Sequence, residues 1–140
     1  MDPATLVLVA ESDRNDFLLT ESTVRACGLT NKLIRFPDGK AILEFLRTAH
    51  CSGPPQDDSY LMILSAGRTD DDALTTLKEV REDGKFSNIP AILLATIMDP
   101  VSICHPHTGR SVILAKPLKK EGLKSALERL GLGSPVSNIV

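Results

Sequence analysis

Several residue types that mark particular classes of protein are scarce in this chain. Its 140 residues include no tryptophan, and aromatic residues make up 4% of them. This argues against the stacking surface of a single-strand nucleic-acid binder. The 16 basic and 18 acidic residues nearly cancel, so no overall positive field is available to hold phosphate groups. We therefore expect no nucleic acid among the partners.

Cysteines and long apolar runs are also few. Cys27, Cys51 and Cys104 are odd in number and far apart, which fits reduced thiols better than a disulfide framework. No apolar run approaches the roughly 18 residues of a membrane-spanning helix. The segment Met1 to Ala4 lacks the basic residues that open a signal peptide. We expect a cytoplasmic protein with no membrane partner.

The motifs of common α/β enzymes are missing as well. The chain contains no G-x-G-x-x-G, no G-x-x-x-x-G-K-[ST] and no G-x-S-x-G, so neither a phosphate cradle nor a nucleophile elbow is expected. The cysteine and histidine positions lack the spacing of a structural zinc site, so we expect no metal there. These positions are Cys104, His105 and His107 in one segment and His50 and Cys51 in another.

Short apolar runs alternate with stretches of helical period. The runs cover residues 6–10, 61–64, 91–95 and 112–115, and unbroken runs of this length are typical of parallel strands covered on both faces. Residues 32–36 mix charge into a fifth candidate strand, which suits an edge. Helical stripes cover 41–49, 73–80 and 123–130, and a weaker helix over 15–27 ends before Gly28. This alternation predicts a three-layer α/β sandwich with five strands.

The length fits one domain, which we place at residues 1–130, followed by a C-terminal tail over 131–140. In an open parallel sheet the ligand site lies beyond the carboxyl ends of the strands. The polar residues there are therefore the candidates for function. They stand in the segments Ala10-Glu11-Ser12-Asp13, Ser65-Ala66-Gly67, Ala95-Thr96 and Lys116-Pro117.

Over residues 5–130 the chain resembles the receiver domain of two-component response regulators, the CheY-like family. The resemblance rests on the order of elements, the acidic cluster after the first strand, Ile89-Pro90 before the fourth strand, and Ala115-Lys116-Pro117-Leu118 before the last helix. The spacing of Asp16, Gly28, Asp38-Gly39 and Phe45-Leu46 is most similar to the small receivers that serve phytochrome-type histidine kinases. The resemblance implies a flavodoxin-like sheet of order 2-1-3-4-5. In this sheet we place the strand at 32–36 on an edge and the other four strands in the interior.

The family accepts a phosphoryl group on an aspartate that closes the third strand, and two acids after the first strand hold Mg²⁺. A lysine neutralises the phosphoryl oxygens, and a hydroxyl residue after the fourth strand drives the switch. The resemblance places Ser65 at the acceptor position and Ala95 at the switch position. Ala10 and Glu11 fall at the acidic pair, or Glu11 and Ser12 with a shift of one residue. Thr96 falls on the opposite side of the strand.

Lys116 matches the family lysine, and the resemblance implies a cis peptide bond between Lys116 and Pro117. With the acceptor missing, Glu11 is expected to pair with Lys116 in place of metal and phosphate. We expect weak or absent Mg²⁺ binding and no other cofactor. The segment 99–109, with Pro100, Pro106 and Gly109, predicts a short, distorted or absent helix.

These departures predict a pseudo-receiver, a signalling module without enzymatic activity that works by binding a protein partner. That partner is a histidine kinase or a signalling output protein. The alternative is a phosphorelay receiver that is phosphorylated at Ser65 or at one of Asp70, Asp71 and Asp72. These three aspartates also suit the N-terminal cap and first turn of the helix that follows them.

Overall fold

A five-stranded parallel sheet forms the centre of the protein. The computed structural model describes residues 1–56, 58–66, 71–95 and 110–133. The strand order is β2-β1-β3-β4-β5, and all neighbouring strands are parallel. This confirms the predicted fold class and strand order. The strands are β1 (Leu6–Ala10), β2 (Leu33–Phe36), β3 (Tyr60–Ser65), β4 (Ala91–Ala95) and β5 (Ser111–Ala115).

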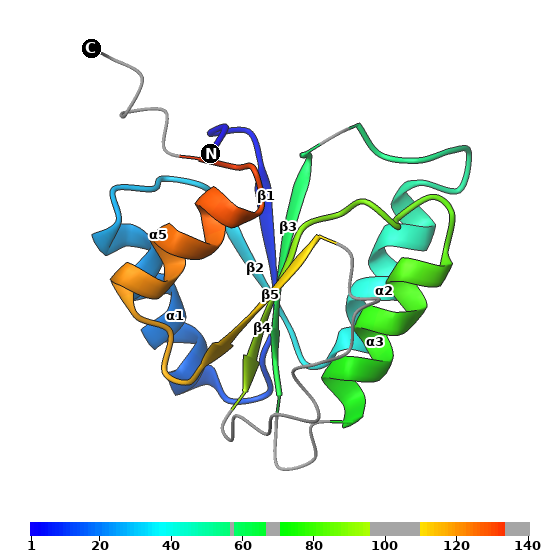
Figure 1. Ribbon diagram of the computed structural model, residues 1–140. Helices are drawn as coiled ribbons and strands as arrows, with labels where there is room; N and C mark the ends of the chain where they lie inside the picture. Colours follow the sequence, from blue (N-terminus) through cyan, green and yellow to red (C-terminus); the bar gives the residue numbers. More distant parts are fainter. Residues whose placement is uncertain (57, 67–70, 96–109, 134–140) are drawn as a thin grey trace.

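Helices cover both faces of the sheet, so the described part of the chain has three layers (Figure 1). The helices α1 (Arg14–Ala26) and α5 (Lys120–Arg129) lie on one face. The helices α2 (Gly39–Ala49) and α3 (Asp71–Glu82) lie on the other. None of the helices among these residues has the length and apolar character needed to cross a membrane.

One strand position differs from the sequence prediction. The strand at 33–36 lies on an edge as expected, but β5 lies on the opposite edge of the sheet rather than in its interior. In this strand Val112 is buried, whereas Ile113 and Leu114 are only partly buried and Ala115 is exposed. An apolar run indicates that helices cover the faces of a strand, and it does not report whether a strand pairs along both of its sides. The interior assignment of 112–115 was therefore wrong.

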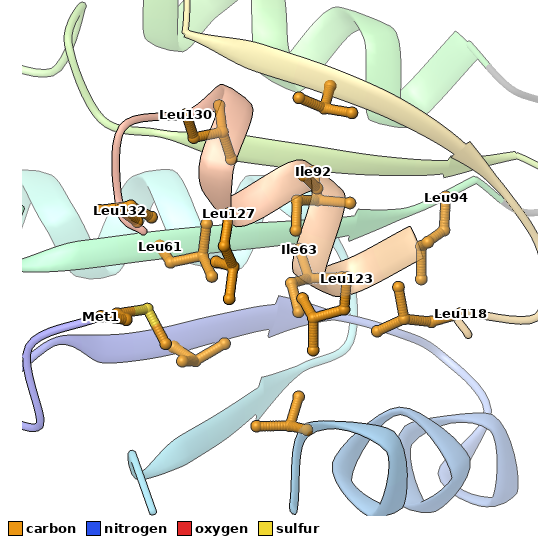
Figure 2. Packing of buried hydrophobic residues seen from close by; sticks show 14 of the residues in the cluster. Met1, Leu61, Ile63, Ile92, Leu94, Leu118, Leu123, Leu127, Leu130 and Leu132 are labelled. Carbon is orange, nitrogen blue, oxygen red and sulfur yellow. The ribbon is translucent and has the colours of Figure 1, made fainter. Parts of the chain in front are cut away.

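Alternating side chains of the strands build one core on each face of the sheet. Leu61 and Ile63 of β3 pack toward α1 and α5, together with Leu123 and Leu127 of α5 (Figure 2). Met62 and Leu64 belong to the second core, on the α2 and α3 side. Complete burial of each such side chain stabilises the fold by about 1.5–3 kcal/mol, so the two cores hold the strand ends in place.

Local sequence signals fix the ends of α1. The Asp13 carboxylate accepts hydrogen bonds from the amides of Asn15 and Asp16, at 2.7 and 3.1 Å, and so caps the helix N-terminus. Gly28 follows the C-cap with φ of 81°, a conformation that glycine adopts without steric cost.

The ordered chain continues beyond the predicted domain end at residue 130. Leu132 is buried in the core shared by α1 and α5, and the Met1 ammonium donates to the Gly133 carbonyl at 2.7 Å. Residues 131–133, which the sequence assigns to the tail, therefore pack onto the domain. Residues 134–140 lie outside the described part of the chain.

Candidate functional site

The carboxyl ends of the strands surround a small cavity of about 70 Å³. Four of the predicted site residues line it: Glu11, Ser65, Lys116 and Pro117. The Lys116–Pro117 peptide bond is cis, as predicted. The remaining lining residues are Asp16, Leu19 and Thr20 of α1, Leu94 of β4 and Leu118.

Ser65 is the last residue of β3 and lies beside Leu94 of β4 in the sheet register. Its Oγ atom is buried and has no hydrogen-bond partner in the part of the chain that the structure describes. A buried hydroxyl without a partner is unusual, because it loses its bonds to water and gains none in return. Within the described ranges, no base is therefore hydrogen-bonded to this hydroxyl to accept its proton.

Glu11 follows β1 directly and is 6% exposed. Since Ala10 pairs with Leu64 in the neighbouring strand, Glu11 stands level with Ser65. The amide of Asp13 donates to Oε2 of Glu11 at 3.0 Å. This contact holds one carboxylate oxygen against the chain that leads into α1.

Lys116 follows β5 and points toward the end of β3. Its ammonium donates to the Ala66 carbonyl oxygen at 2.6 Å, while its backbone amide donates to the carbonyl of Ala95 at 2.9 Å. The predicted ion pair between Lys116 and Glu11 is therefore wrong. The backbone carbonyl accepts from the ammonium, and the Glu11 carboxylate is held by the Asp13 amide instead. The ion pairs within the described residues are Arg25–Glu21, Arg47–Asp83 and Arg110–Asp58.

Other predicted site residues do not reach the cavity. Ala10 is 5% exposed and packs in the core beneath α2 and α3. Ala95 stands two and four residues after Leu93 and Ala91 of that core, so strand alternation places it on the same face. Ser12 is exposed, and Asp13 caps α1. The acidic cluster thus contributes Glu11 to the cavity, whereas the neighbours of Glu11 serve the fold.

Among the described residues, the cavity offers few oxygen ligands of the kind that Mg²⁺ prefers. This ion demands near-octahedral oxygen ligands, usually from one or two carboxylates together with phosphate and water. Ala10 offers no oxygen and Ser65 offers a hydroxyl, so Glu11 is the buried carboxylate of the cavity and Asp16 is exposed. Across residues 1–56, 58–66, 71–95 and 110–133, no three His, Cys, Asp or Glu side chains gather into a metal-binding group.

Several predicted positions lie wholly or partly outside the described residues. They are Asp70, Thr96, Cys104, His105, His107 and the segment 99–109. Helix α3 begins at Asp71, which agrees with the expected place of the aspartates at its N-terminus, but the side chains of Asp71 and Asp72 are not described. In the other candidate metal segment, His50 Nε2 and the Tyr60 hydroxyl share a hydrogen bond of 2.6 Å, and Cys51 is exposed.

Helix α1 contributes a wall of the cavity that sequence reasoning missed. Leu19 lines the cavity although its side chain is 59% exposed, and the adjacent Leu18 is 48% exposed. The helix prediction over 15–27 was weak because these two leucines lie on the solvent-exposed face of the helix and interrupt its apolar period. Two neighbouring apolar residues on an otherwise polar helix face were the signal that could have identified this wall.

The parallel sheet of order 2-1-3-4-5 is that of a flavodoxin-like α/β domain, and a lysine and a cis-proline stand at the carboxyl ends of its strands, as the resemblance to receiver domains implies. Comparisons with known proteins agree. No protein-family model matches the chain. The probable methanogenesis regulatory protein FilR2 of Methanothrix harundinacea (strain 6Ac) is 25% identical over 130 residues, which cover 92% of this chain and 82% of that protein.

Solved structures of similar fold are response regulators. The bacteriophytochrome response regulator AtBRR superposes with a TM-score of 0.76 at 22% identity, over 99% of both chains. A response regulator receiver domain from Rhodospirillum rubrum superposes with a TM-score of 0.66 at 25% identity, over 91% of this chain and 92% of that one. The chain therefore has the fold of response regulator receiver domains, which confirms the resemblance seen in its sequence.

Proposed function

We propose that the protein is a cytoplasmic, non-enzymatic signalling module of the response-regulator type that works by binding a partner protein without phosphorylation. The observation that carries this proposal is Ser65, a residue with an unpartnered hydroxyl at the end of β3. A receiver of the phosphorelay type uses a carboxylate at the corresponding strand end. The partner is a histidine kinase or a signalling output protein.

The chemistry of the cavity supports this proposal. Transfer of a phosphoryl group to a serine hydroxyl needs a base to accept the proton, and the described residues place none on Ser65 Oγ. The Lys116 ammonium, which would neutralise a phosphoryl oxygen, donates to the Ala66 carbonyl. With Ala10 in the core, the cavity also lacks the pair of buried carboxylates that would hold Mg²⁺.

The test uses beryllofluoride, which mimics an acyl phosphate when a carboxylate and Mg²⁺ are both present. Amide NMR spectra of the isotope-labelled protein are recorded with Mg²⁺ alone and with Mg²⁺ plus beryllofluoride. We expect no shifts at Glu11, Ser65 or Lys116. The Ser65→Asp variant should respond weakly, because it adds a carboxylate beside Glu11 but gains no further ligand from Ala10, whose side chain packs in the core.

Phosphate mapping completes the test and depends on no variant. The wild-type protein is incubated with acetyl phosphate and Mg²⁺, or with a phosphorylated histidine kinase, and then analysed by peptide mass spectrometry. Stoichiometric phosphate on Ser65 or on one of Asp70, Asp71 and Asp72 would overturn the proposal and establish a phosphorelay receiver with an atypical acceptor. An unmodified protein supports the pseudo-receiver function.

A further inference from the structure

The cavity beside Ser65 contains two polar groups with unused hydrogen-bonding capacity. Glu11 is 6% exposed and makes no ion pair among the described residues, and one of its carboxylate oxygens accepts from the Asp13 amide. The buried Ser65 hydroxyl has no hydrogen-bond partner among the described residues. A buried carboxylate without a cation is costly, so an occupant that brings a positive charge to Glu11 is favoured.

The charges around the cavity indicate a cationic occupant. Its lining holds two carboxylates, Glu11 and Asp16, and one ammonium, that of Lys116. The Lys116 ammonium is directed to the Ala66 carbonyl. The guanidinium of Arg35 also lies near, but it donates to the main-chain carbonyl of Glu11 at 3.1 Å and does not line the cavity. The residues that line the cavity therefore carry one more negative than positive charge.

The size and the walls of the cavity select among cations. Leu19, Leu94, Pro117 and Leu118 supply apolar walls around the two polar groups, which suit an aliphatic stem with one charged tip. A cavity of about 70 Å³ suits the compact ammonium of lysine better than the broad planar guanidinium of arginine. Outside the mouth, the exposed Leu18 offers an apolar surface beside Leu19.

We propose that this cavity binds a lysine side chain of the partner protein. The lysine ammonium donates to the Glu11 carboxylate, and the methylene stem packs against Leu19 and Leu118. An apolar residue beside the partner's lysine packs on Leu18. This inference rests on the proposed function, because the cavity is open to a lysine only where neither phosphate nor metal occupies it.

The first experiment uses n-butylammonium chloride as a lysine side-chain probe in amide NMR titrations of the full chain at pH 7. We expect saturable shifts at Glu11, Ser65 and Leu19, and none with sodium butyrate or n-butanol at matched ionic strength. Glu11→Gln keeps the shape of the side chain and its bond to the Asp13 amide, and should weaken binding roughly tenfold. The control Glu44→Gln, an exposed position on α2, should bind as the wild type does.

The second experiment tests for a peptide source of the lysine. The peptide acetyl-Leu-Lys-Leu-amide should shift the same amides and also that of Leu18. Its norleucine analogue, which has the same stem without the ammonium, should bind at least several-fold more weakly. Leu18→Ser should weaken binding of the lysine peptide and leave binding of n-butylammonium unchanged.

Three results would overturn the inference: no saturable shift with n-butylammonium, equal binding by Glu11→Gln, or equal binding of the two peptides. Equal peptide binding combined with n-butylammonium binding would identify a site for free amines instead of a partner's lysine. None of these results bears on phosphorylation. The proposed function therefore stands or falls by the beryllofluoride and phosphate-mapping experiments.

Discussion

Replacement of Ser65 by alanine should make the protein more stable. The Ser65 hydroxyl is buried without a partner, and such a group lowers stability by about 1–3 kcal/mol relative to a satisfied or absent one. Ser65→Ala removes a single oxygen atom and leaves Cβ in place, so the few lost dispersion contacts cost only ~0.1–0.2 kcal/mol each. We expect the free energy of unfolding to rise by about 1 kcal/mol.

The same chemical change at two other serines provides matched controls. The Ser111 hydroxyl accepts a hydrogen bond from the Arg81 guanidinium at 2.8 Å, and bonds to charged groups contribute about 1.5–3 kcal/mol. Ser111→Ala should therefore lower the free energy of unfolding. Ser87 is exposed, so Ser87→Ala should change it by less than about 0.5 kcal/mol.

Urea unfolding followed by circular dichroism is the suitable assay, because the chain has no tryptophan and one tyrosine. If the slope of the free energy of unfolding against urea concentration is the same in all variants, the substitutions have changed stability without changing the surface exposed on unfolding. The reasoning is refuted if Ser65→Ala lowers the free energy of unfolding by more than about 0.5 kcal/mol, because the hydroxyl would then have a hydrogen-bond partner in the native state.

Two further predictions concern packing and pH. Gly39→Ala should lower the free energy of unfolding by about 1–3 kcal/mol, because a Cβ there would lie 2.6 Å from Cβ and 2.7 Å from Cγ2 of Thr76 in α3. Gly84→Ala meets no atom within 4 Å and should be neutral, so equal urea midpoints for these two variants would contradict the close helix contact. Burial raises the pKa of Tyr60 above its ordinary value of 10.0, so its stabilising contribution is complete below pH 10 and is lost as the pH rises through the folded pKa. Wild type should therefore lose stability relative to Tyr60→Phe as the pH rises above about 10, and a pH-independent difference between the two urea curves would count against this.

Much of the candidate site could be predicted because it follows from strand ends. Ser65, Glu11 and Lys116 each stand directly after an apolar run, and parallel strands bring their carboxyl ends to one edge. The acceptors of hydrogen bonds could not be predicted in the same way. The Ala66 carbonyl that receives the Lys116 ammonium is a backbone group, and every residue of the chain carries one. Only the folded position of the β3 end distinguishes it from the others.

The sequence by itself determined the elements and their order. Unbroken apolar runs are too short for helices, and the helical stripes between them leave a parallel sheet covered on both faces as the consistent architecture. Only the tertiary structure decided that Leu19 of α1 walls the cavity. It also decided that the Ser65 hydroxyl is left unpaired. The physical reason is that periodicity reports which face of an element is covered, whereas pairing partners and cavities depend on how separate elements meet.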